Sequence, residues 1–134
     1  MGVEGLRVFQ LSYDVSLDLH RASLSWPKVE QYGGVADQVR RSSKSVCALL
    51  AEGEGRLRGS AREFERYLVM ALGSADETRL WCKYAEDLGY ASPEQATAWR
   101  ASLAEVARML QGLLANQRRK KQINQTAADR PKIS

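Results

Sequence analysis

Four consecutive basic residues near the C-terminus have the types and spacing best suited to binding chemistry. Arg118, Arg119, Lys120 and Lys121 belong to residues 118–134, which carry six basic groups against one aspartate. Residues 1–117 carry 14 basic and 15 acidic groups, so the net charge of +4 comes from the end of the chain. A basic end on a near-neutral body suits phosphate contacts with a nucleic acid. The alternative is a frayed terminus that only keeps the protein soluble.

A second group of cations surrounds a predicted helical hairpin in the middle of the chain. Glutamates alternate with these cations, and the i,i+3 spacing predicts ion pairs between Arg62 and Glu65 and between Glu63 and Arg66. The pattern fits a continuous basic patch for nucleic acid, and equally well arginines that hold helices or subunits together. The cations are Arg40, Arg41, Lys44, Arg56, Arg58, Arg62 and Arg66.

Catalytic and metal-binding chemistry is not expected. The one histidine, His20, lies on an apolar helical stripe, which leaves a nucleophilic triad without a base. A di-iron bundle would need a Glu-x-x-His motif on each of two helices. Cys47 and Cys82 form no CxxC pair, and we interpret them as reduced thiols in the core. We therefore expect no catalytic residue, no metal and no cofactor.

Hydrophobic periodicity predicts four helices that position these side chains. Ser60 and Ser92 are expected to cap the third and fourth helices, the latter with Pro93 and Gln95. Short connections indicate antiparallel neighbours, hence an all-α, up-down-up-down four-helix bundle over residues 1–121 and a basic, disordered tail over 122–134. The expected helices cover residues 5–22, 28–52, 61–88 and 93–121.

Two features of these helices are expected to affect packing. The first helix has one apolar stripe through Phe9, Tyr13, Leu17 and His20 and another through Val8, Leu11, Val15 and Leu19, which indicates self-association. The second feature is the position of the glycines. Gly33-Gly34 predicts a kink or a false start of the second helix, residues 53–59 a glycine-punctuated loop, and Gly73 a close helix crossing.

The composition is that of a globular chain without membrane contact. Hydrophobic residues make up 44% and charged residues 27% of 134 residues. No apolar run approaches the roughly 20 residues needed to cross a bilayer. The N-terminus has no basic segment followed by an apolar block, so we expect a cytoplasmic location.

Five motifs follow one another in the chain: WPKVEQYG at 26–33, QVRRSSKS at 38–45, AEGEGR at 51–56, REFERYL at 62–68 and ALGSADE at 71–77. In this order they resemble the S23 family, also called 23S rRNA intervening-sequence proteins. The resemblance covers roughly residues 6–115. It departs at Leu49, where the family usually has asparagine before Ala-Glu-Gly, so any polar contact that the asparagine makes in the loop or the oligomer interface is missing here.

The resemblance implies a small cytosolic four-helix bundle. Many members are encoded inside intervening sequences of ribosomal RNA genes. The family is related to accessory variability determinant proteins of diversity-generating retroelements, which form basic pentamers that bind a reverse transcriptase and nucleic acid. We therefore expect a non-enzymatic homo-oligomer, with a pentamer favoured, that binds RNA or DNA. The alternative is a retroelement scaffold that binds a reverse transcriptase together with its RNA.

Overall fold

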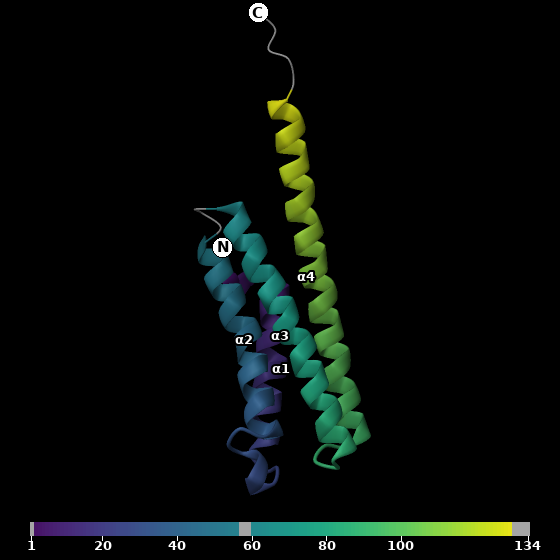
Figure 1. The fold of residues 1–134 in the computed structure, drawn as a ribbon. Helices are drawn as coiled ribbons and strands as arrows, with labels where there is room; N and C mark the ends of the chain where they lie inside the picture. The colour runs from purple at the N-terminus through teal and green to yellow at the C-terminus, as the bar shows by residue number, and fades with distance from the viewer. Residues whose placement is uncertain (1, 57–59, 130–134) are drawn as a thin grey trace, which may run out of the picture.

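The computed structural model describes residues 2–56 and 60–129, which form four α-helices and two short 3-10 helices. No strand occurs among these residues, and the all-α four-helix bundle is confirmed. Figure 1 shows the four helices packed side by side, with α4 extending beyond the others. The elements are η1 (Val3–Gly5), α1 (Arg7–Ser23), η2 (Lys28–Glu30), α2 (Val35–Arg56), α3 (Ala61–Asp87) and α4 (Pro93–Ala128).

Successive helices run in opposite directions. The Oγ atoms of Ser45 in α2 and Ser74 in α3 lie 3.1 Å apart. Earlier in α2, Ser42 accepts a hydrogen bond from Thr78, which lies later in α3. Figure 1 shows the same reversal between α3 and α4. The start of α3 and the C-terminal part of α4 are therefore at the same end of the bundle.

The bundle core consists of two apolar clusters with a layer of hydroxyl groups between them. One cluster contains Trp26 and Trp99, and the other contains Phe64. Between them in α2, Ser43 is buried and its hydroxyl lies 3.0 Å from that of Ser16 in α1. Small hydroxyl side chains let the helix backbones approach closely, and their mutual hydrogen bonds remove the cost of burying a polar group.

The two apolar stripes of α1 have different surroundings. Val15 and Leu19 are buried in the core, as their stripe predicts. The other stripe is left partly uncovered: Tyr13 is 49% exposed and stacks on Phe9, with ring centroids 5.9 Å apart. The first helix thus keeps an apolar face that the bundle itself does not bury.

The paired glycines after Trp26-Pro27 lie between the short 3-10 helix η2 and the start of α2 at Val35, so of the two expected alternatives the false start is observed and the kink is not, and the expected start near residue 28 is corrected. Gly33 has a φ of 77°, a left-handed conformation that favours glycine. A Cβ at Gly34 would lie 2.3 Å from Oε1 of Glu30. That carboxylate accepts hydrogen bonds from the backbone N–H of Val35 and the hydroxyl of Tyr90, and so joins the start of α2 to the α3–α4 connection.

The close crossing between helices is at Gly53 and not at Gly73. A Cβ at Gly53 would lie 2.7 Å from the Cβ of Tyr67 in α3, whereas one at Gly73 would meet nothing within 4 Å. Gly53 is buried inside α2, which continues to Arg56 past the expected end at Glu52. Packing against Tyr67 therefore overrides the weak helix propensity of glycine.

The fourth helix is longer than expected. It begins at a complete capping box between Ser92 and Gln95, as predicted, and continues to Ala128 instead of ending at Lys121. Residues 122–128 of the expected tail are therefore helical, in keeping with the absence of glycine and proline between Gly112 and Pro131. Residues 130–134 of that tail lie outside the described residues. Within the described ranges, no helix combines the length and the apolar character needed to cross a bilayer.

Candidate nucleic-acid interface

The C-terminal part of α4 carries the four consecutive cations. The last buried residue of the helix is Leu114, and every residue from Arg118 to Ala128 is exposed. We call residues 118–128 the overhang. At about 1.5 Å per residue it is about 16 Å long. Arg118, Arg119, Lys120 and Lys121 lie beside the first turns of α3, at the end of the bundle, and all four are exposed; only the later part of the overhang extends past the other helices (Figure 1).

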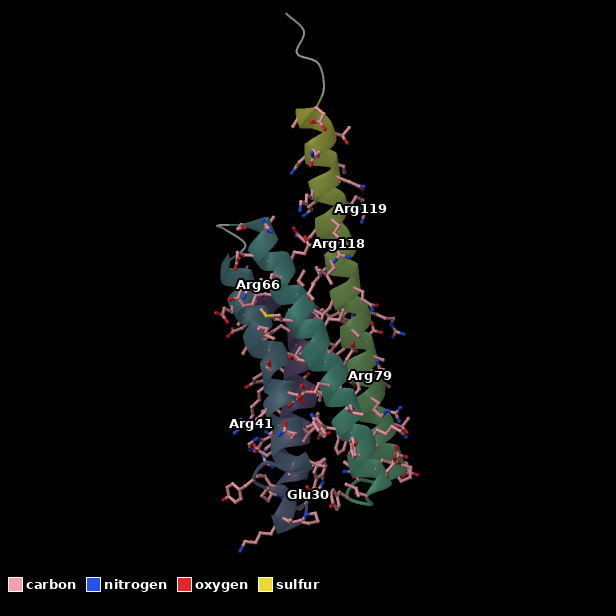
Figure 2. The ribbon with its side chains drawn as sticks, viewed as in Figure 1. Glu30, Arg41, Arg66, Arg79, Arg118 and Arg119 are labelled. Carbon is pink, nitrogen blue, oxygen red and sulfur yellow. The ribbon has the colours of Figure 1, made fainter. Side chains whose placement is uncertain are left out.

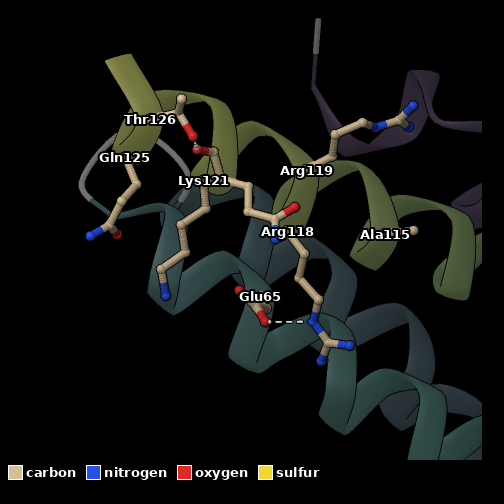
Figure 3. A pocket seen from close by; sticks show the side chains of 8 residues that line it. Glu65, Ala115, Arg118, Arg119, Lys121, Gln125 and Thr126 are labelled. Atoms are coloured by element: carbon tan, nitrogen blue, oxygen red, sulfur yellow. Dashed lines mark hydrogen bonds and ion pairs between the residues drawn. The ribbon is translucent and has the colours of Figure 1, made fainter. Parts of the chain in front are cut away.

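A notch of about 740 Å³ lies between the overhang and the start of α3 (Figure 3). Arg118 extends across it, and its Nε donates to Oε1 of Glu65 at 3.0 Å. Among the described residues, this is the one ion pair made by the four cations of the overhang. We call this hollow the α3–α4 notch; its lining residues are Glu65, Ala115, Arg118, Arg119, Lys121, Gln122, Gln125 and Thr126.

Lys121 connects the notch to cations of α3. It also borders a second hollow, together with Arg62 and Arg66. Arg66 is held 3.8 Å from Glu63, which confirms one of the two expected ion pairs. In the part of the chain described here, Glu65 pairs with Arg118 across the bundle and not with Arg62. The basic surface at this end is therefore built from the overhang and the first two turns of α3.

The overhang also carries cations whose side chains are not directed at Glu65. Arg119 extends away from Glu65 in Figure 3, and its Nη2 donates to Oδ1 of Asn116 at 2.9 Å. Lys120 is exposed. A polyanion that engages the overhang can thus meet positive charge on more than one face of the helix.

Arg40 and Arg41 of α2 lie away from this surface. Arg40 donates to Oγ of Ser23 and to the carbonyl oxygen of Gln31, so its guanidinium stabilises the α1–α2 connection. Arg41 pairs with Asp37 at 3.0 Å and lies toward the opposite end of the bundle from Arg118 (Figure 2).

The remaining cations of the expected basic patch are Lys44, Arg56 and Arg58. Lys44 donates to Nδ1 of His20 at 3.0 Å, beside the uncovered stripe of α1. Arg56 is the last residue of α2, and its side chain lies outside the described part of the structure. Arg58 lies outside the described residues altogether.

Hydrogen bonds and burial account for the shifted pKa values near these cations. Desolvation, with added repulsion from Lys44, Arg40 and Arg21, lowers the pKa of His20 below its ordinary value. The pKa of Asp37 is lowered because its carboxylate accepts from the Gly33 amide and from Arg41. Neither residue borders the α3–α4 notch.

The two cysteines are free thiols, as the sequence predicts. Cys82 is fully buried, and burial raises its pKa to about 12. Cys47 is half-buried beside Tyr13 and Leu17, and burial raises its pKa to about 11. Both thiols therefore stay protonated at neutral pH, which makes them poor nucleophiles.

A family model for the 23S rRNA-intervening sequence protein matches residues 4–112. The chain belongs to this family. The predicted resemblance is thereby confirmed, and residues 4–112 cover most of the four-helix bundle.

A solved structure supports the fold of this family member. The chain is similar to the crystal structure of a protein of unknown function from the S23 ribosomal protein family of Bacteroides thetaiotaomicron, with a TM-score of 0.70 and 21% sequence identity. The similarity covers 80% of this chain and 97% of that one. A comparison with curated proteins gives no significant match.

The matched residues end before the overhang begins. Residues 118–121 follow the family match by more than one helical turn. The bundle is thus the part that this chain shares with its family, while the cations that line the notch lie beyond the matched region. Any function of the notch has to be argued from this chain's own residues.

The sequence pattern does not predict two kinds of notch residue. The i,i+3 spacing predicts a pair between Glu65 and Arg62, whereas the observed contact between Glu65 and Arg118 spans 53 positions. Gln122, Gln125 and Thr126 fall in the expected disordered tail. The antiparallel pairing of α3 and α4 about their short connection is the signal that places Glu65 near residue 115.

Proposed function

We propose that this 23S rRNA-intervening sequence family member binds RNA or DNA through phosphate contacts and catalyses no reaction. The observation that carries the proposal is the overhang: four consecutive exposed cations on a projecting helix, with one ion pair to a carboxylate among the described residues. Arginine and lysine in such a position are the usual partners of phosphate groups.

The chemistry of the notch favours contacts to the backbone of a nucleic acid over contacts to its bases. No aromatic side chain is among the notch's lining residues, so stacking of bases on aromatic rings does not occur there. The side-chain amides of Gln122 and Gln125 supply hydrogen-bond donors beside the cations, whereas the Thr126 hydroxyl donates to the carbonyl oxygen of Gln122. Affinity should therefore depend on phosphate neutralisation and fall steeply with salt.

The proposal includes a homo-oligomer, with a pentamer favoured by the family resemblance. Two apolar faces support it. Tyr13 lies on the outer face of α1, and Leu80 and Tyr84, each nearly half exposed, lie on α3. In the described structure α1 and α3 each pack on α2 and α4 but not on one another, so they are diagonal and their outer faces point apart. Contact between two different faces generates a ring when the rotation closes.

Repetition of the notch around such a ring would strengthen binding. When several overhangs bind the same nucleic-acid chain, each contact after the first is intramolecular. The overall affinity therefore rises without any new kind of contact. Light scattering on the purified protein measures the number of subunits. A single-copy particle at all concentrations would refute the oligomeric part of the proposal and leave the phosphate contacts to be tested by themselves.

The decisive experiment removes the four cations of the overhang. The variant R118A/R119A/K120A/K121A is expected to bind a labelled single-stranded RNA more weakly than the wild type in a low-salt filter-binding assay. Each lost phosphate contact removes about 0.7 from the slope of log affinity against log salt on a single strand, so four contacts remove about 3. Circular dichroism should show that the bundle remains folded.

A matched variant controls for the loss of overall charge. R21A/K28A/K83A/R108A also removes four exposed cations, but all four lie away from the overhang. Its RNA affinity should stay much closer to that of the wild type. Equal affinity of the overhang variant and the wild type would refute the role of the overhang, and equal losses in both variants would reduce the effect to net charge.

A further inference from the structure

The α3–α4 notch has one carboxylate among its lining residues, that of Glu65. Glu65 lies in the second turn of α3, and its side chain is 24% exposed, the lowest exposure of any residue in the ion pairs near the overhang. It borders both hollows at this end of the bundle, and among their lining residues it is the one carboxylate. A carboxylate surrounded by Arg62, Arg118 and Lys121 has the charge and hydrogen-bonding oxygens that a phosphate would bring to the same place.

The contact between Glu65 and Arg118 is one that a phosphate can replace. The guanidinium contacts the carboxylate through Nε, and its side chain is 63% exposed. Arginine binds phosphate in a bidentate manner through two parallel N–H groups, which is a stronger arrangement than a single contact. A partly exposed ion pair contributes little to stability, at most about fivefold in an equilibrium constant, so a phosphate can replace the carboxylate at small cost.

We propose that Glu65 is a built-in competitor for phosphate, which holds the Arg118 guanidinium in the free protein and is displaced by a phosphate of the nucleic-acid backbone. The inference rests on the proposed function. It adds that one phosphate of the nucleic acid binds at Arg118, and that Glu65 lowers the affinity for the nucleic acid. In the free protein Glu65 also keeps Arg118 directed across the notch. On binding, Arg118 turns to the phosphate and Glu65 is left to solvent.

Removal of the competing charge should raise affinity. With a short fluorescein-labelled single-stranded RNA at low salt, E65Q is expected to bind about two- to fivefold more tightly than the wild type by polarisation, which is the fold-change equivalent of a surface ion pair. The shape of the side chain is kept, so the effect reports on charge. The helical circular-dichroism signal should match that of the wild type.

Glu63 supplies the matched control. It lies two residues earlier in α3 and pairs with Arg66 on its own helix, 3.8 Å away, rather than with the overhang. E63Q should change RNA affinity much less than E65Q does. Equal gains in the two variants would overturn the inference, because the effect would then be general electrostatics. A loss of affinity in E65Q would also overturn it and make Glu65 a residue that positions Arg118 for binding.

A double variant separates this inference from the proposed function. In the R118A background, E65Q should bring no gain, because the competition requires the guanidinium; an equal gain with and without Arg118 would overturn the exchange. If the wild type and the four-alanine overhang variant bind RNA equally well, the proposed function itself fails. Poly-L-glutamate serves as the last probe: binding as tight as that of RNA would assign the notch to acidic peptides instead.

Discussion

Replacement of Gly53 by alanine tests whether α2 and α3 depend on close backbone approach. The added Cβ would lie 2.7 Å from the Cβ of Tyr67 and 3.7 Å from Cδ2 of Phe64. Carbon atoms normally approach to about 3.5–4.0 Å, so the helices must separate by about 1 Å. Tyr67 cannot move away by a change of rotamer, since its Cβ is fixed to the backbone.

The expected loss follows from two opposing effects. Overpacking of this kind costs about 1–3 kcal/mol, and the gain in helix propensity from glycine to alanine offsets about 1 kcal/mol. Gly112 provides the control, because it is exposed inside α4 and an added Cβ would meet nothing within 4 Å. G112A should therefore gain up to about 1 kcal/mol from propensity alone.

Thermal and urea unfolding followed by circular dichroism measures the difference. The two variants should differ by about 1–3 kcal/mol, which for a chain of this size corresponds to about 3–10 °C in Tm. G53A should have the lower midpoint in both assays. Equal stability of G53A and G112A would refute the requirement for glycine at the α2–α3 crossing.

Two further predictions concern the face of α1 and α2 near Lys44. The pKa of His20 is lower in the folded protein than in the unfolded chain, so the unfolded chain binds the proton first as the pH decreases. Stability should therefore fall as the pH decreases through about 6.5 and toward the pKa of His20 in the folded protein. H20Q should flatten this part of the plot of Tm against pH, and an unchanged plot would contradict the lowered pKa of His20. Iodoacetamide at mildly alkaline pH should modify Cys47 slowly, since a pKa of about 11 leaves about a hundredfold less thiolate than a free thiol. Cys82 should react only through unfolding, so rapid labelling of Cys82 under native conditions would contradict its burial.

The parts of the fold that depend on local sequence could be predicted. Ser92, Pro93 and Gln95 determine where α4 begins, because the capping box involves residues three apart. The buried side of α4 follows the same local logic, since Trp99 and Leu110 belong to one heptad stripe and both are buried. Interactions within one or two helical turns leave a direct pattern in the sequence.

The parts that depend on packing between helices could not be predicted. The low helix propensity of Gly53 predicts the start of a loop there, but Gly53 packs against Tyr67 and is helical. Leu49, which stands where the family usually has asparagine, packs against the second apolar cluster and leaves the fold intact. Arg40 resembled a surface cation, whereas its bonds to Ser23 and Gln31 fix a connection.

The length of α4 bears on the role of its cations. Had the helix ended at Lys121, the four basic residues would have occupied its last turn, where positive charge stabilises the C-terminal end of the dipole. Because the helix continues to Ala128, its last turn holds no basic residue and the cations lie in its interior. The helix dipole therefore gives no structural reason for four adjacent cations, three of which make no ion pair among the described residues. Because these cations lie in a helix at the end of the bundle, beside Arg62 and Arg66 of α3, they form one basic surface, as contact with a polyanion requires.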